Sequence, residues 1–123
     1  MTRVLSYNIL VGGTRRVHQI DRMISSARPD IVGLVEATNP RVVEELAQRL
    51  EMQPVMSGTA EHPKNRQIAV LTRLPIVSTQ VHIRPRILSR PVLEVCVEEP
   101  NGQQLTVFVT HLSAAFNLSL IHI

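Results

Sequence analysis

The stretch IVGLVE (residues 31–36) gives the clearest indication of the fold. Its first five residues are apolar, which is typical of a short strand buried on both faces of a sheet. Glu36 then places a carboxylate at the end of that strand, and such a group is costly to desolvate unless it meets a cation or hydrogen-bond donors. A Mg²⁺ site needs only one or two protein carboxylates. The stretch therefore predicts a central strand that ends in a metal ligand; the alternative is a solvated Glu36 that leads into a helix.

Helix signals stand on both sides of this strand. Residues 3–10 predict a first strand, which Gly12 and Gly13 end, and Thr14 is the expected N-cap of the helix that follows. The apolar stripe of this helix consists of Val17, Ile20, Ile24 and Ala27. Downstream, Asn39-Pro40 predicts a second helix start, because Asn caps helices and Pro suits the first helical position. Its apolar stripe consists of Val42, Val43, Leu46 and Leu50.

The pattern changes to strands after the second helix. Residues 53–56 give a short and weak strand signal, and the stronger ones cover residues 67–72, 76–83, 92–97 and 105–111. Asn101-Gly102 predicts a hairpin between the last two, because these residues accept positive φ angles. The predicted class is α/β with the order β-α-β-α-β-β-β-β. We expect both helices on one face of a sheet whose strands end at Asn8, Glu36, Thr72 and Ile83, with residues 31–35 central and the hairpin at its side.

Composition narrows the class of protein. The chain has 123 residues, 44% hydrophobic and 19% charged, which fits one globular domain. A single cysteine, Cys96, excludes an internal disulfide framework and a Cys-rich zinc site. The apolar runs are too short for a transmembrane helix, and no signal-peptide pattern is present. We therefore expect a cytoplasmic protein with no integral membrane segment, and no obligate protein partner is evident.

The basic residues are almost all arginine. Twelve of the thirteen are Arg and only Lys64 is Lys, and the formal net charge is +3. Arginine suits phosphate recognition because its planar fork binds two oxygens at once; the alternative is a GC-rich genome that raises arginine everywhere. The arginines are dispersed, which disfavours a dedicated nucleic-acid-binding patch.

Three polar residues stand at predicted strand ends, where scaffolds often present catalytic groups. They are Asn8, Glu36 and His111. Each alone has a structural alternative, since Asn8 can be a turn residue and a lone histidine is usually structural. Together with the sequence segments around them, the three residues are more informative than each is alone.

Four segments in order carry a resemblance to a known family. They are VLSYNI (4–9), DIVGLVE (30–36), QIAVLTRLPI (67–76) and VFVTHL (107–112). Over residues 3–113 the chain resembles the endonuclease/exonuclease/phosphatase superfamily, the DNase I-like metallophosphoesterases. The resemblance implies the N-terminal half of a four-layer α-β-β-α sandwich.

The resemblance also implies roles for single residues. Glu36 matches the family's metal-binding glutamate, normally for Mg²⁺ and possible for Mn²⁺, and Asn8 matches an asparagine that helps hold metal and phosphate. His111 matches the catalytic histidine that contacts the scissile phosphate. Arg90 falls where some members have a phosphate-binding arginine; the alternative is a solvated residue at a strand start. The implied reaction is metal-assisted in-line attack of water on phosphorus.

The chain departs from the family pattern in two places. Val35 precedes Glu36 where glutamine is common, and the family's Gly-Asp-Phe-Asn and Ser-Asp-His segments are absent, so the catalytic base is missing. We expect residues 1–117 to be a truncated domain and residues 118–123 to be a sequencing-adapter scar, the alternative being a natural short strand. The predicted function is a fragment of a Mg²⁺-dependent phosphoesterase. The substrate is expected to be a nucleic acid, a lipid head group or a small phosphate ester; the alternative is a non-catalytic binding module or an inert truncation product.

Overall fold

The computed structural model describes residues 1–58, 68–83 and 90–111. Within them two helices and seven strands follow one another, with a short 3-10 turn η1 (Val11–Gly13) after the first strand. The helices are α1 (Val17–Ala27) and α2 (Pro40–Leu50). The strands are β1 (Val4–Asn8), β2 (Ile31–Val35), β3 (Gln53–Met56), β4 (Ile68–Thr72), β5 (Ile76–His82), β6 (Val92–Glu98) and β7 (Gln104–Thr110). Neither helix, among the residues described, has the length and apolar character needed to cross a bilayer.

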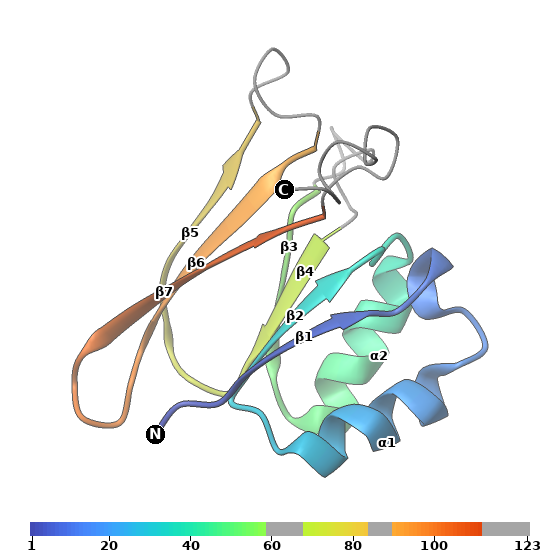
Figure 1. Cartoon of the computed structure of the whole chain (residues 1–123), viewed down its shortest axis with the longest axis horizontal. Coiled ribbons are helices and arrows are strands. Elements are labelled where there is room, and N and C mark those ends of the chain that lie inside the picture. The colour runs from blue at the N-terminus through green and yellow to red at the C-terminus, as the bar shows by residue number, and fades with distance from the viewer. Residues whose placement is uncertain (59–67, 84–89, 112–123) are drawn as a thin grey trace, which may run out of the picture.

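The strands form two sheets that pack face to face. The first sheet has the order β1-β2-β4-β3, in which β1 and β2 run parallel and the other pairs are antiparallel. The second is antiparallel with the order β5-β6-β7. The helices cover the side of the first sheet that faces away from the second (Figure 1). The described residues thus form three successive layers of an α-β-β-α sandwich, and β2 is central as predicted.

The all-apolar sequence of β2 follows from its position between two hydrophobic clusters. Val32 and Leu34 pack against the helices, where Ile24, Val43 and Leu46 are also fully buried. Ile31 faces the second sheet, together with Ile68, Val70, Leu93, Val95 and Val97. Both faces of β2 are therefore in a core, and no polar residue fits between its ends.

Gly33 sets the distance between the sheets at one point. A Cβ atom at this position would lie 3.1 Å from Cγ2 of Val109 in β7. The absence of a side chain at Gly33 therefore lets β7 approach β2 closely.

The start of the first helix differs from the prediction, whereas the start of the second agrees with it. α1 begins after Arg16, and no side chain caps it. The predicted cap, Thr14, instead accepts a hydrogen bond from Nδ2 of Asn39 at 3.4 Å, because Gly12, Gly13 and Arg15 adopt positive φ and carry the chain through another turn first. Asn39 caps α2 as predicted, and its Oδ1 accepts from the Arg41 amide at 3.1 Å.

The strand that was expected to end at Ile83 was assigned to the wrong sheet. Strand β5 pairs with β6 in the second sheet, and the weak signal at residues 53–56 becomes β3 at the edge of the first sheet. Five strands therefore follow α2 instead of four. The chain leaves β4 through a turn in which Thr72 Oγ1 bonds the amide and carbonyl of Leu74, and the Pro75 carbonyl accepts from the Glu98 amide at the start of the new sheet.

The predicted hairpin is present. Gly102 has a φ of 85° between β6 and β7, and its amide donates to the Glu99 carbonyl at 2.9 Å. The prediction that residues 118–123 are a scar lies outside the described residues.

Candidate active site

The candidate site lies where the ends of three strands meet. Asn8 closes β1 and pairs in register with Val35, the last residue of the parallel neighbour β2, so Glu36 is one step further along the same edge. His111 follows β7 in the facing sheet. Oε1 of Glu36 lies 4.0 Å from Nε2 of His111, and both side chains are about three-quarters buried. The fold thus brings together two of the predicted site residues across the seam between the sheets.

Glu36 has an unusual backbone conformation. Its φ is 58°, in the left-handed region, which costs a non-glycine residue about 1–2 kcal/mol. The Glu36 carbonyl accepts a hydrogen bond from the Gly12 amide at 2.8 Å, and the Ile9 amide donates to the Val35 carbonyl at 3.2 Å. Strained residues of this kind persist only when their surroundings fix them, and they cluster at functional sites. The chain after β1 therefore holds the turn from which the Glu36 carboxylate projects.

Arg90 determines which tautomer a neutral His111 adopts. Its Nη1 lies 2.5 Å from Nδ1 of the imidazole. A guanidinium can only donate, so Nδ1 accepts and a neutral His111 carries its proton on Nε2, which faces Glu36. Arg90 is half-buried and contacts His111. Arg90, His111 and Glu36 lie in a row across the seam.

Asn8 takes a different place from these three. It is exposed, and its Oδ1 accepts a hydrogen bond from the Leu10 amide at 2.8 Å, as in an Asx turn. Such a hydrogen bond is expected of a turn residue, which was the alternative interpretation of Asn8. The amide oxygen has a second lone pair, and the register with β2 keeps Asn8 at the same sheet edge as Glu36.

The donor set at this edge fits a water-rich magnesium site. No group of three or more His, Cys, Asp and Glu side chains that could hold a metal ion is found among the described residues. Mg²⁺, however, usually keeps several waters and takes one or two carboxylates together with substrate phosphate. The Glu36 carboxylate and the Asn8 amide oxygen fit such a site, whereas a cage made of protein ligands alone does not form here.

Arg16 lies near the candidate site, although the sequence did not indicate it as a site residue. Its Nη2 donates to the Ile9 carbonyl at 2.7 Å and also to the Leu10 carbonyl. Both carbonyls belong to the turn that carries Asn8 and contacts Glu36. One signal was available, because Gly12-Gly13 directly after a strand indicates a tight loop next to the strand end.

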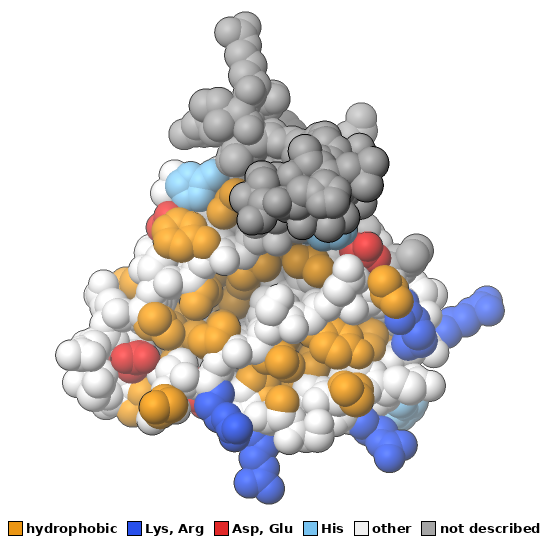
Figure 2. Space-filling model, in the orientation of Figure 1, with side chains coloured by type: hydrophobic (Ala, Val, Ile, Leu, Met, Phe, Trp, Pro, Cys, Tyr) orange, Lys and Arg blue, Asp and Glu red, His pale blue; other side chains and the backbone are white. Residues whose placement is uncertain are grey.

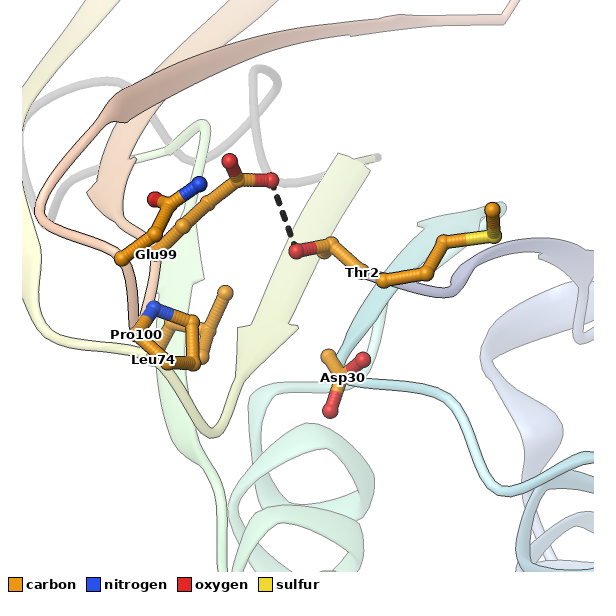
Figure 3. Close-up of a pocket in the computed structure, with 7 residues that line it drawn as sticks. Thr2, Asp30, Leu74, Glu99 and Pro100 are labelled. Carbon is orange, nitrogen blue, oxygen red and sulfur yellow. Dashed lines mark hydrogen bonds between the residues drawn. The ribbon is translucent and has the colours of Figure 1, made fainter.

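A separate cavity of about 220 Å³ lies away from this seam, beside the residue that precedes β2 (Figure 3). Its two carboxylates already have partners. Oε1 of Glu99 accepts from Oγ1 of Thr2 at 2.7 Å, and Oδ2 of Asp30 accepts from the Arg3 amide at 2.8 Å. Both acidic side chains of the cavity are therefore bonded to residues at the N-terminus of the chain.

Comparison with known proteins supports the fold. No protein-family model matches the sequence, and no match was found among curated proteins. Among solved structures, zebrafish (D. rerio) TDP2 humanized by 14 mutations superposes with a TM-score of 0.76 at 19% identity, over 97% of this chain and 50% of that chain. ANGEL2, a 2',3'-cyclic phosphatase in complex with adenosine-2',3'-vanadate, superposes with a TM-score of 0.68 at 20% identity, over 93% of this chain and 42% of that chain.

The chain has a DNase I-like fold. TDP2 and ANGEL2 belong to the endonuclease/exonuclease/phosphatase superfamily, so the resemblance carried by the four sequence segments is confirmed at the level of the fold. The chain matches the N-terminal part of that fold and spans about half the length of these structures. TDP2 from C. elegans gives the same result, with a TM-score of 0.66 at 18% identity over 94% of this chain and 37% of that chain.

Proposed function

We propose that this chain carries part of the active site of a Mg²⁺-dependent phosphoesterase, in which Mn²⁺ can replace Mg²⁺. The observation that carries the proposal is the meeting of Glu36 and His111 at 4.0 Å, with Arg90 behind His111, at the ends of strands in a DNase I-like fold. The neighbours add support, since one TDP2 structure is a complex with a single-strand DNA product and ANGEL2 is a 2',3'-cyclic phosphatase.

Each residue has a separate role in this proposal. Glu36, with the Asn8 amide oxygen, holds the metal ion. When bound, the ion shields phosphate charge and stabilises the leaving oxygen during attack by water. His111 donates its Nε2 proton in a hydrogen bond to a phosphoryl oxygen, where negative charge develops. Arg90 keeps the proton on Nε2 and adds a positive charge for phosphate.

The group that activates the attacking water is not among these residues. Glu36 is the one carboxylate of the described residues that we assign to this site, and a metal ligand is a poor general base. We therefore attribute the full activity to a protein of which this chain is the N-terminal part, with residues 1–117 belonging to the domain. The half-length match to the solved structures supports this.

A nucleic-acid phosphoester is the substrate that we favour, over a lipid head group or a small phosphate ester. The support is the single-strand DNA product bound to a structural neighbour. The Lys and Arg side chains visible in Figure 2 lie along the lower and right edges of that face and form no broad patch, which fits contact with a short segment better than tracking along a long duplex. A reducing, cytoplasmic setting is also proposed, because the single cysteine, Cys96, is a buried free thiol.

A magnesium titration of the ¹⁵N-labelled chain tests the proposal. We expect Mg²⁺ to shift the amide signals of residues 8 and 36 with millimolar affinity, because one carboxylate holds the ion weakly. Glu36→Gln should abolish these shifts. Glu44→Gln, at an exposed position of α2, is the matched control and should leave them unchanged. Shifts that survive Glu36→Gln would contradict the proposal.

The chain by itself is expected to hydrolyse phosphodiesters poorly. With Mg²⁺ and a generic aryl phosphodiester, no turnover that Glu36→Gln abolishes should be detected, because the base lies elsewhere. Robust turnover that depends on Glu36 would mean that the base is present within residues 1–123 and that its placement here is wrong. Metal binding without any contact to phosphate esters would instead favour a non-catalytic binding module.

A further inference from the structure

The segment between β1 and α1 connects one arginine to the candidate metal ligand by a short series of hydrogen bonds. Arg16 Nη2 donates to the carbonyls of Ile9 and Leu10. The Leu10 carbonyl also accepts from the Gly13 amide at 2.9 Å, which closes the turn η1. Within that turn the Gly12 amide donates to the Glu36 carbonyl at 2.8 Å. Three hydrogen bonds therefore link Arg16 to Glu36, the first donated by the Arg16 side chain and the other two formed between backbone groups.

This turn is strained and needs such support. Leu10 has φ 52° and ψ 115°, and Glu36 has φ 58°, so each of the two segments that the Gly12 amide joins contains a non-glycine residue with positive φ. Gly12 itself has a φ of 75°, and a Cβ atom there would lie 2.8 Å from Oγ1 of Thr38, so the turn fits closely against the chain after Glu36. Strain of this kind persists only where neighbouring groups over-determine the conformation.

The backbone of Arg16 is itself held in place. The Arg16 carbonyl accepts a hydrogen bond from the Ile20 amide at 3.0 Å in the first turn of α1, and Ile20 is 2% exposed in the core between the helices and the first sheet. Arg16 is half-buried, and both acceptors of its Nη2 are backbone carbonyls. A planar guanidinium can donate to two oxygens at once, which a lysine ammonium on a flexible stem does with less precision.

We propose that Arg16 is a positioning residue for the candidate metal site. By holding the Ile9 and Leu10 carbonyls it fixes the turn, so that the Gly12 amide keeps Glu36 in its left-handed conformation and its carboxylate beside His111. This inference rests on the proposed function as far as the metal is concerned. The placement of the Glu36 backbone by Arg16 does not depend on it.

The experiment compares Arg16→Ala, Arg16→Lys and the control Arg22→Ala in the ¹⁵N-labelled chain without metal and then with Mg²⁺. Arg22 is exposed on α1, so its replacement should change nothing near Glu36. Without metal, Arg16→Ala should speed exchange of the Gly12 amide by about 10-fold, the effect of losing one charge-assisted hydrogen bond, while amides of β2 stay protected. The signals of Glu36 and His111 should move with it.

With metal, Arg16→Ala should raise the Mg²⁺ concentration needed for half of the Glu36 shift by about 10-fold, as groups that orient a ligand typically do. Arg16→Lys should restore part of both effects, because an ammonium still reaches one carbonyl. A merely structural role would lower the protection of α1 and β2 together and would not move Glu36 selectively.

The outcomes separate the two proposals. If the unsubstituted chain shows no Mg²⁺ shift at residue 36, the proposed function is wrong, but Gly12 exchange still tests the role of Arg16. If Arg16→Ala leaves Gly12 exchange and the Glu36 signal unchanged, the inference is wrong. If Arg16→Ala does not fold, Arg16→Lys decides, and unchanged Gly12 exchange in that variant also overturns the inference.

Discussion

The two sheets differ in what covers their outer faces. Helices α1 and α2 lie over the first sheet, and their buried side chains close a core with β2 (Figure 1). On the second sheet no described helix covers the outer face, and Phe108 is 63% exposed there, with its ring centroid 6.5 Å from that of His82. Glu36 belongs to the covered sheet and His111 to the open one.

This difference shows how the candidate site is built. Glu36 is held from within its own layer, through Gly12 and the turn after β1. His111 follows β7, an edge strand in the described part of the second sheet, and depends on the close contact at Gly33 and on Arg90 for its position. A groove of about 330 Å³ between β1, β2 and β7 lies beside this contact, and Figure 2 shows a hollow lined by apolar side chains.

The largest expected effect is on the free energy of unfolding, and it tests whether the two sheets unfold as one unit. Leu46 of α2 and Leu93 of β6 are both 0% exposed, one in each hydrophobic cluster. Replacement of either by Ala should lower the free energy of unfolding by about 3 kcal/mol, through lost burial and a residual cavity. Urea unfolding followed by circular dichroism should give a single transition in each case. Two transitions, or an effect of Leu93→Ala far below that of Leu46→Ala, would mean that the open sheet folds separately.

A smaller effect is expected where the sheets touch. Gly33→Ala places a methyl group 3.1 Å from Cγ2 of Val109, and Val109 is only partly buried and can yield slightly. The free energy of unfolding should fall by about 1 kcal/mol, as in mild overpacking. The His111 signals should shift while those of α1 stay in place, because the first sheet is fixed by its helices. Unchanged His111 signals would show that the seam does not position this residue.

Arg90→Ala should act on His111 more than on stability. The loss of one partly exposed hydrogen bond should cost about 0.5–1 kcal/mol of unfolding free energy. The neutral imidazole should change from the tautomer with the proton on Nε2 to a mixture, because the donor to Nδ1 is removed. Long-range ¹H–¹⁵N correlation spectra of the imidazole measure this directly. A pure Nε2 tautomer in the variant would contradict the role assigned to Arg90.

The smallest effect is expected on the open face. Phe108→Thr replaces an exposed ring in β7 by a β-branched side chain that suits a strand, so the free energy of unfolding should change by about 0.5 kcal/mol or less. Concentration-dependent association, measured by sedimentation velocity, should decrease because an exposed apolar side chain is lost. A large loss of stability would mean that the outer face is packed in a way that its exposure does not reveal.

Local signals predicted the elements that depend on local interactions. Five apolar residues predicted β2, Asn39-Pro40 predicted the start of α2, and Asn101-Gly102 predicted the hairpin. Burial on both faces, helix capping and positive φ each depend on a short stretch of sequence, so these elements could be recognised locally. The same holds for Glu36, a carboxylate that had to lie at a strand end.

Pairing and long-range contacts could not be predicted in this way. The sequence of residues 76–82 is that of a strand in either sheet, and only the turn through Leu74 and Pro75 sends it to the second. Thr14 matches the sequence pattern of a cap, but the positive φ angles of Gly12, Gly13 and Arg15 carry the chain through a further turn before α1 begins. Arg16 is one arginine among twelve, and its contacts with the Ile9 and Leu10 carbonyls depend on how that turn folds.

Paramagnetic broadening by Mn²⁺ tests most directly whether Glu36 and His111, from two different sheets, belong to one site, in which Glu36 and Asn8 hold the metal ion. With substoichiometric Mn²⁺, the amides of Glu36 and Asn8 should broaden first, followed by that of His111 in the other sheet, while α1 and the Asn101-Gly102 turn stay sharp. Glu36→Gln should remove the effect at both sheets, and Glu44→Gln should not. Broadening confined to one sheet, or centred elsewhere and insensitive to Glu36→Gln, would contradict the account.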